Sequence, residues 1–210
     1  MGLLSLLFHN PAMFFVLAVL LLYSVIAHEV AHGWAARLFG DDTAERYGRL
    51  TLNPVRHLDP VGTLMLFVVG FGWARPVPVN YYNLKSGRAA VIAVSIAGCL
   101  TNILIAAAGI ALLRFRIVGD NTVFGVVLPI AIRINIILGA FNLIPIPPLD
   151  GSRVLMSLLP PRGRESLAQL EPYGLLLIIV LLFTGALSPV IVFMQRLIYG
   201  IISFFFGMFG

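Results

Sequence analysis

The sequence predicts an all-α polytopic membrane protein with about five transmembrane helices and a re-entrant or β-hairpin element near residues 60–80. Of the 210 residues, 60% are hydrophobic and only 11% are charged, whereas about a quarter of the residues in soluble domains are charged. The mean hydropathy is +0.99, and apolar runs long enough to cross a bilayer recur along the chain. These features exclude a soluble globular domain, a disordered chain and a disulfide scaffold.

One membrane-embedded domain is expected over residues 1–210, because this length leaves no room for an added soluble domain of ordinary size. Its motif-bearing core is expected over about 11–151, followed by a C-terminal helical pair over about 173–206. The first 27 residues contain no Lys or Arg. They therefore do not resemble a secretory signal peptide, and the first apolar segment is expected to be retained.

The net charge of +5 reflects 14 Lys and Arg residues against nine acids. In a soluble protein such an excess could indicate nucleic-acid binding, but in an apolar chain it is typical of arginines that flank membrane spans. We therefore expect the lipid bilayer, and no nucleic acid, as a partner. The single cysteine, Cys99, can form no internal disulfide.

The first predicted helix runs from Pro11 to Phe39. Pro11 suits a first helical position, and Asn10 can cap the helix. His28 would lie roughly 26 Å along the axis from Pro11. In a hydrocarbon core about 30 Å thick, this is near the far side but still at membrane depth.

The apolar segment over residues 60–73 is short and rich in glycine, and Pro76 and Pro78 follow it. These prolines suit an edge strand rather than a helix interior. We predict a re-entrant or hairpin-like element that turns at residues 70–72, with a full membrane crossing as the alternative. An edge strand over residues 74–80 could pair with an extended substrate.

Further spans are predicted after this element, and one of them contains Arg133, for which the sequence indicates no single role. The predicted spans cover residues 89–113 and 121–143, a polar proline-rich loop covers 145–172, and the last two apolar runs cover 173–183 and 189–206.

The most informative motif is His28-Glu29-Val30-Ala31-His32, which matches H-E-x-x-H. On a helix, residues i and i+4 share a face, so both imidazoles can reach one metal ion. Glu29 lies beside them and can act as a general base on a metal-bound water. The alternative is a buried polar pair that is satisfied by neighbouring spans.

Two histidines are one ligand short of a usual catalytic zinc site, which has three protein ligands. Asp150 is a candidate for the third, because the prolines just before it break the helix and allow the backbone to bend back toward the membrane. The alternative is an ordinary turn residue.

Three segments of the chain together resemble the site-2 proteases, which are intramembrane zinc metalloproteases that cut substrates within or beside a membrane span. The segments are His28–His32, Ala97–Asn102 and Asn142–Gly151. Cys99 stands where many members have proline. Residues 50–80 resemble a compact bacterial branch of the family. The expected single domain leaves no room for the PDZ or CBS modules that other branches carry.

The resemblance implies one zinc ion per chain, held by His28, His32 and Asp150, with Glu29 as the base that activates a zinc-bound water. The implied reaction is hydrolysis of peptide bonds in membrane-spanning protein substrates. Anti-sigma factors and signal-peptide remnants are among the substrates that such enzymes cut.

The resemblance also implies that Asn102 and Asn142 help to hold the substrate or the transition state. A hydrogen bond between helices is the alternative for Asn102. For Asn142 the alternative is satisfaction of backbone groups freed by the nearby prolines. His57 lies in a polar loop with arginines and is interpreted as a surface or interface residue, not as a ligand.

The metal geometry constrains the topology. If Asp150 meets both histidines at one depth, residues 40–88 must make an even number of crossings, since the two spans that follow form an out-and-back pair. With residues 60–73 re-entrant, nine Lys and Arg residues lie on one side and two on the other. The positive-inside rule then predicts a multi-pass protein of the cell (plasma) membrane, with its N-terminus outside and its active site toward the cytoplasm.

Two other classes of function are compatible with the motif. One is a catalytically silent metal-binding membrane scaffold or transporter. Glu29 is the only acid well inside a span, which speaks against a transporter. The other is a hydrolase that acts on lipid, which only the family resemblance disfavours.

Overall fold

A computed structural model describes residues 7–69, 72–117 and 123–208, and within these ranges the chain is helical and contains no strand. Five helical segments of the described residues are long and apolar enough to cross a membrane, which confirms the predicted fold class. These segments are Pro11–Leu38, Gly87–Arg114, Val123–Asn142, Pro161–Phe183 and Ser188–Gly207.

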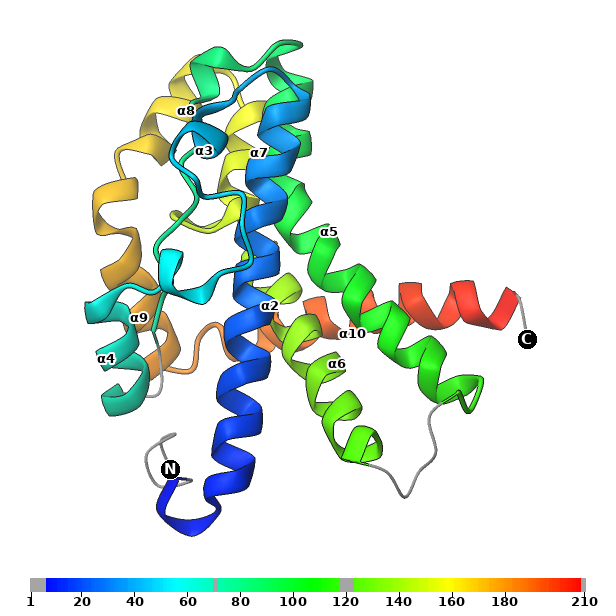
Figure 1. The fold of residues 1–210 in the computed structure, drawn as a ribbon. Coiled ribbons are helices and arrows are strands. Elements are labelled where there is room, and N and C mark those ends of the chain that lie inside the picture. Colours follow the sequence, from blue (N-terminus) through cyan, green and yellow to red (C-terminus); the bar gives the residue numbers. More distant parts are fainter. Residues whose placement is uncertain (1–6, 70–71, 118–122, 209–210) are drawn as a thin grey trace.

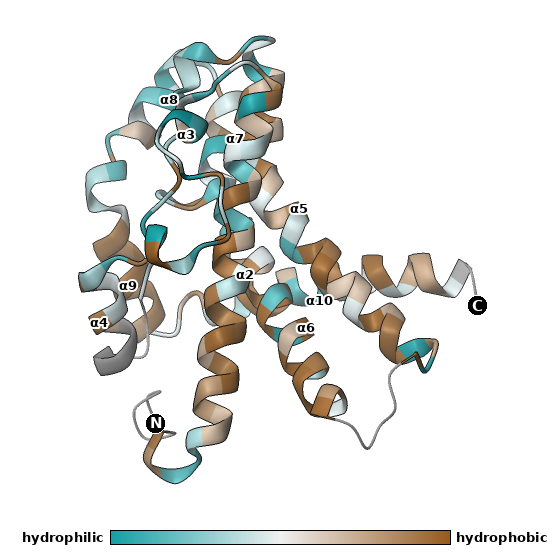
Figure 2. Cartoon of the chain, viewed as in Figure 1, coloured by the Kyte–Doolittle hydropathy of each residue, from teal (hydrophilic) through white to brown (hydrophobic). Residues whose placement is uncertain are grey.

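The first three of these helices form the centre of the fold. Helix α2 (Pro11–Leu38) begins as predicted, with Pro11 in the first turn and the Asn10 side chain accepting a hydrogen bond from the Met13 amide at 3.0 Å. Helix α5 (Gly87–Arg114) packs against both α2 and α6 (Val123–Asn142) (Figure 1). Figure 2 shows the lower parts of these helices as hydrophobic, while the polar residues gather at the opposite end, around α3 and α8.

The segment between α2 and α5 leaves and returns to the same end of the molecule. It contains α3 (Thr43–Arg46), η1 (Pro54–Arg56), α4 (Pro60–Val69) and η2 (Tyr81–Asn83). The ten residues of α4 span only about 15 Å, about half the thickness of a hydrocarbon core. The Lys85 amide donates to the Phe39 carbonyl at 2.7 Å, which closes the segment at the end of α2.

This closure supports the expected even number of crossings and excludes the alternative of a single full crossing by residues 60–73. The β-hairpin version of the prediction is wrong for the described residues, because α4 is helical and the chain after residue 71 is extended without forming a strand. Helix forms here because Pro60 suits a first helical position and the uncharged run after it contains the good helix formers Leu64, Met65 and Leu66. The predicted turn at residues 70–72 includes two positions, 70 and 71, that lie outside the described residues.

Asp41 ties the end of α2 to the end of the returning segment. Its fully buried carboxylate accepts hydrogen bonds from the backbone and side chain of Thr43, from the Asn80 amide at 2.7 Å and from the Asn83 side chain at 3.0 Å. Burial opposes ionisation of the carboxyl, but these donors outweigh it and hold the pKa of Asp41 below its usual value. The extended chain before Asn80 is thereby held alongside α2.

The sequence indicated that His57 lies at the surface or an interface, but the structure places it in the interior. It is fully buried; its Nε2 donates to the Thr51 carbonyl at 2.8 Å, and its own carbonyl accepts from the Arg75 amide at 2.8 Å. The polar loop folds back on itself and onto the returning chain, so a residue in a locally polar sequence becomes enclosed.

Most of the region predicted as a proline-rich loop is helical. Helices α7 (Asp150–Leu158) and α8 (Pro161–Ala168) occupy it, followed by η3 (Glu171–Tyr173) and α9 (Gly174–Phe183). The prolines interrupt the helices over residues 145–148 and at residue 160. Pro161 instead begins α8, where its missing N–H group removes no helical hydrogen bond. Helix α10 (Ser188–Met208) then runs across α6 and also contacts α5 (Figure 1).

The Asp41 network predicts a pH-dependent contribution to stability. Because the pKa of Asp41 is lower in the folded protein, its ionised form stabilises the fold above the unfolded-state pKa of about 4, and this contribution is lost as the pH falls below it. We expect Asp41→Asn to cost about 1–3 kcal/mol at pH 7 and much less at pH 3. Thermal unfolding in detergent at both pH values measures this difference.

Asp42→Asn is the matched control, because the Asp42 side chain forms a surface ion pair with Arg46 at 2.7 Å and, within the described part of the chain, no other ion pair or hydrogen bond. A surface pair of this kind is worth at most about 0.5 kcal/mol. An equal loss of stability at both pH values in Asp41→Asn would contradict the assignment.

Candidate metal centre

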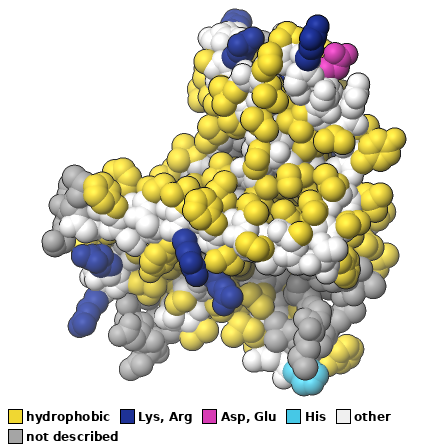
Figure 3. All heavy atoms as spheres, turned by 180° about the vertical axis from the view of Figure 1, so that it is seen from behind, with side chains coloured by type: hydrophobic (Ala, Val, Ile, Leu, Met, Phe, Trp, Pro, Cys, Tyr) yellow, Lys and Arg dark blue, Asp and Glu magenta, His cyan; other side chains and the backbone are white. Residues whose placement is uncertain are grey.

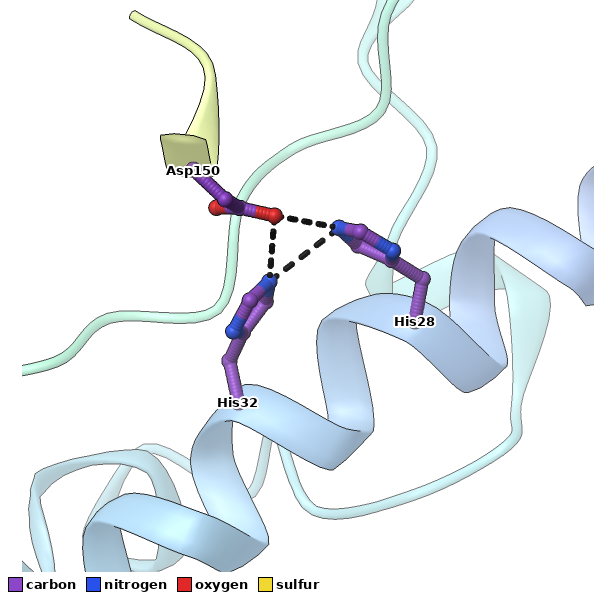
Figure 4. A group of neighbouring side chains, drawn as sticks. All are labelled: His28, His32 and Asp150. Carbon is purple, nitrogen blue, oxygen red and sulfur yellow. Dashed lines mark hydrogen bonds and ion pairs between the residues drawn. The ribbon is translucent and has the colours of Figure 1, made fainter. Parts of the chain in front are cut away.

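Helix α2 places His28 and His32 on one face. Both side chains are buried, and their Nε2 atoms lie 3.1 Å apart. Figure 4 shows the two rings turned toward the same point, where the carboxylate of Asp150 also points. The Oδ2 atom of Asp150 lies 3.0 Å from Nε2 of His28 and 3.2 Å from Nε2 of His32. The structure therefore brings together the three residues that the sequence suggested.

Asp150 reaches this point because the chain after α6 is folded tightly. Ile144 and Leu149 are buried in an apolar cluster with Ile178 and Leu187, which anchors the turn between α6 and α7. Gly151 permits the turn, since a Cβ atom there would lie 2.2 Å from the Leu143 carbonyl oxygen. Asp150 thus becomes the first residue of α7 and faces α2.

Hydrogen bonds on the far side of each ring set its orientation. Nδ1 of His28 donates to the side-chain oxygen of Asn102 at 2.7 Å, and Nδ1 of His32 donates to the Val94 carbonyl at 2.7 Å. Both acceptors require the proton on Nδ1, so the lone pairs on Nε2 face each other and the carboxylate of Asp150. Such backing of a ring nitrogen is the usual arrangement for histidines that bind a metal.

Three electron-pair donors that face one another in a buried space repel unless a cation lies between them. Their separations of 3.0–3.2 Å are close to the spacing of about 3.3 Å between ligands that surround a zinc ion tetrahedrally at about 2.0–2.1 Å. Within the described residues this is the one group of His, Cys, Asp or Glu side chains arranged to hold a metal ion. The donor set fits zinc, with two nitrogens and one oxygen.

Asn102 is part of a buried polar network that the sequence did not reveal. Its amide nitrogen donates to Asn135 at 2.8 Å and to the Ser24 carbonyl at 3.3 Å, and Asn135 in turn donates to the Ser24 hydroxyl at 2.9 Å. The network joins α2, α5 and α6 behind His28. A polar residue in an apolar span is the signal that could have pointed to Asn135.

Gly98 allows α5 to approach the two histidines. A Cβ atom at this position would lie 2.5 Å from Nε2 of His32 and 2.6 Å from Nε2 of His28. These distances are shorter than side chains tolerate, so a glycine is needed for the backbone of α5 to pass beside the rings.

Glu29 is anchored by the chain that follows α4. Its Oε2 accepts a hydrogen bond from the Val77 amide at 2.9 Å, in the extended chain after α4. Two residues earlier, the Arg75 carbonyl accepts from Arg49 at 2.7 Å. Residues 75 and 77 share one edge of an extended chain, and this edge, with the Arg75 carbonyl and the Val77 amide, faces the protein.

Asn142 and Arg153 lie on either side of Asp150 in the chain. The Asn142 amide donates to the Leu138 carbonyl at 3.0 Å, a bond within α6. Arg153, one turn after Asp150, stacks over the Tyr81 ring at 4.8 Å and pairs with Glu171 at 3.3 Å. Arg153 thereby joins α7 to both η2 and η3, a role that the sequence did not indicate.

Comparisons with known proteins agree with this geometry. Residues 120–185 match the family model of peptidase family M50. The chain is 44% identical over 175 residues to "Putative zinc metalloprotease YwhC" of Bacillus subtilis (strain 168), with 80% of each chain covered. The chain belongs to peptidase family M50. It is a zinc metalloprotease with zinc as its cofactor, and the expected membership of the site-2 protease family is confirmed.

More distant members show the same relationship. The protein Rip2 of Mycolicibacterium smegmatis, which bears the same description as YwhC, is 32% identical over 172 residues, covering 80% of this chain and 66% of Rip2. "Zinc metalloprotease MJ0392" of Methanocaldococcus jannaschii is 29% identical over 152 residues, covering 72% of this chain but 36% of that protein. No solved structure matches the chain.

The close approach at Gly98 predicts that Gly98→Ala lowers the zinc content of the purified protein well below that of the wild type, because the new methyl group displaces both imidazoles. Zinc is measured by mass spectrometry per chain in detergent. Gly139→Ala, on α6, is the matched control: its Cβ would have no neighbour closer than 3.5 Å. Equal zinc content in Gly98→Ala and wild type would show that α5 can move aside.

The bond from His28 to Asn102 predicts that Asn102→Leu weakens zinc binding by about 10–100-fold, as loss of a partner behind a ligand typically does. Competition with a zinc-sensitive chelator dye measures the affinity. Thr101→Val serves as the control on the neighbouring position of α5. Unchanged affinity in Asn102→Leu would mean that the ring is held without this hydrogen bond.

Proposed function

We propose that this zinc metalloprotease is an intramembrane endopeptidase that hydrolyses peptide bonds of membrane-spanning substrates. The observation that carries the proposal is the convergence of His28, His32 and Asp150 among helices long and apolar enough to cross a membrane. His28 is 17 residues beyond the start of α2, or roughly 26 Å along it. A centre at this depth is accessible to peptide bonds within or beside a membrane span.

His28, His32 and Asp150 are proposed to hold the zinc ion, which leaves the fourth position of a tetrahedral site open. When bound, zinc lowers the pKa of water toward about 7 and polarises the scissile carbonyl. Glu29 takes the proton from the attacking water and passes it to the leaving amine. The Val77 amide holds Oε2 of Glu29 at 2.9 Å, which leaves the second carboxylate oxygen for this task.

The two asparagines have different surroundings, which bears on the roles expected for them. Both polar atoms of Asn102 already have protein partners, so we propose that Asn102 acts by orienting His28. Asn142 uses only its amide nitrogen within α6, and its side-chain oxygen takes part in no hydrogen bond among the described residues. Asn142 is therefore the one we propose for contact with the substrate.

We further propose that the centre faces the cytoplasm of the cell and that the N-terminus is outside. The hydrogen bond from Lys85 to Phe39 returns the chain to the end of α2. Arg114 and Arg116 then lie at one end of the helices, and nine other basic residues, from Arg46 to Arg164, lie in segments at the other end. Cytoplasmic loops carry the excess of Lys and Arg. Membrane-spanning proteins such as anti-sigma factors and signal-peptide remnants are the proposed substrates.

The sharpest test combines zinc content with cleavage of labelled single-span peptides, including signal-peptide remnants, in detergent or liposomes. We expect about one zinc per wild-type chain, retained in Glu29→Gln and largely lost in Asp150→Ala. Cleavage should fall by about 10²–10⁴-fold in Glu29→Gln, because only the proton transfer is removed.

Glu45→Gln is a suitable control, since Glu45 is an exposed partner of Arg37 at 2.9 Å. Full zinc content in Asp150→Ala would remove Asp150 from the centre, and full cleavage by Glu29→Gln would remove Glu29 from the reaction. Zinc flux into liposomes without any cleavage would favour a transporter.

A further inference from the structure

Arg49 is the one buried Lys or Arg side chain in the part of the chain that the structure describes. Only 8% of its surface is exposed, whereas the other basic side chains are partly or fully exposed, and Figure 3 shows several of them standing out from one face of the molecule. The Arg49 guanidinium donates one hydrogen bond, to the Arg75 carbonyl at 2.7 Å, and its Nε has no partner among the described residues. Burial of a charge with so few partners costs free energy, so stability alone does not account for its position.

The charges around Arg49 connect it with Glu29. Burial lowers the pKa of the Arg49 guanidinium, and the positive charges of Arg75 and Arg56 also lower it, whereas the negative charge of Glu29 raises it. An arginine stays charged in proteins, so Glu29 is the acid whose charge offsets this buried cation. No direct ion pair joins the two side chains within the described residues, and they therefore attract each other through space.

The chain segments that carry Arg49 and Val77 meet on the face of α2 that carries Glu29. Gly33 lies one turn after Glu29 on this face. A Cβ atom at Gly33 would lie 2.6 Å from Cδ2 of Leu50, the residue after Arg49, and 2.9 Å from Cγ1 of Val77. Both segments are therefore packed against α2 within one turn of Glu29.

A short, stiff link connects the Arg49 guanidinium to the Glu29 carboxylate. Arg49 holds the carbonyl of Arg75. Two residues later, the Val77 amide donates to Oε2 of Glu29 at 2.9 Å. Pro76 lies between them, and its ring fixes one of the two backbone torsions at that position. A displacement of the Arg75 carbonyl would therefore move the Val77 amide as well.

We propose that Arg49 is a positioning residue for Glu29 in the proteolytic reaction. Its hydrogen bond to Arg75 holds the Val77 amide where that amide binds Oε2 of Glu29, and its charge offsets that of the carboxylate. The inference rests on the proposed function, in which Glu29 is the base. It assigns to Arg49 no contact with the substrate or with zinc.

Hydrogen exchange tests the hold on Val77 without any substrate. Residues 75–78 include two prolines, which have no N–H group, so their only backbone amides are those of Arg75 and Val77, and both are hydrogen-bonded. Arg49→Met removes the donor and the charge, and we expect it to speed exchange in this segment at least about tenfold in detergent, as measured by mass spectrometry. Arg49→Lys keeps a charged donor and should exchange at close to the wild-type rate. Arg46→Met is the matched control, because Arg46 is exposed.

Cleavage of a labelled single-span peptide by the full chain tests the effect on the reaction. Arg49→Met should lower kcat about 10–100-fold and change KM by less than about twofold, because misplacement of a catalytic group slows the reaction without weakening substrate binding. Arg49→Lys should recover most of kcat, and Arg46→Met should match the wild type. Zinc content and helical circular dichroism verify folding, and Arg49→Gln replaces Arg49→Met if that variant fails these checks.

A double variant tests whether Arg49 acts through the Val77 amide. Val77→Pro removes this amide, so the addition of Arg49→Met to it should lower kcat further by less than about twofold. If Arg49 contributed only to the general stability of the fold, its full loss would be added instead, and the inference would be wrong.

Three other results would overturn the inference: wild-type exchange of residues 75–78 in Arg49→Met, an unchanged kcat, or a raised KM as the main effect, which would assign Arg49 to substrate binding. They leave the proposed function intact as long as the wild type cuts the peptide and Glu29→Gln does not. A wild type that cuts no peptide would contradict the proposed function itself. The exchange rate would then decide alone whether Arg49 holds Val77.

Discussion

The mutual approach of two imidazole nitrogens and one carboxylate oxygen is the constraint on which the rest of the structure depends. Without a cation between them, these three electron-pair donors repel one another in an apolar bundle. A bound cation removes this repulsion because it attracts all three. The protein holds them in place from behind: Asn102 and the Val94 carbonyl fix the rings, and the tight turn before Gly151 fixes the carboxylate. Affinity for zinc therefore depends directly on how α2, α5 and α7 pack together.

The segment between α2 and α5 has a comparable constraint. It must leave and return to one end so that Asp150, at the end of an out-and-back pair, meets α2 at the right level. The Lys85–Phe39 hydrogen bond and the buried Asp41 carboxylate close the segment. The same closure holds the Val77 amide against Glu29, so that the topology of the chain and the orientation of the general base are coupled.

The spans were predictable because a bilayer imposes length and apolarity on a local stretch of sequence. The observed bounds of α2, α5 and α6 lie within about two residues of the expected ones, and the even number of crossings followed from the ligands. Predictions failed where contacts with other parts of the chain decide the local structure or burial. The polarity around His57 suggested exposure, yet the loop encloses it, and the region predicted as a loop forms α7 and α8 because its prolines fall only at helix boundaries.

The sequence by itself determined the fold class, the helix that carries His28, Glu29 and His32, and the candidacy of Asp150, since each is expressed in local apolarity, in helical periodicity or in a short motif. The tertiary structure decided what holds these groups. The Asn102–Asn135–Ser24 network and the bond between Glu29 and Val77 join residues between 33 and 111 positions apart, and the need for glycine at position 98 depends on the distance between helices. Such contacts arise from packing, and no local pattern records them.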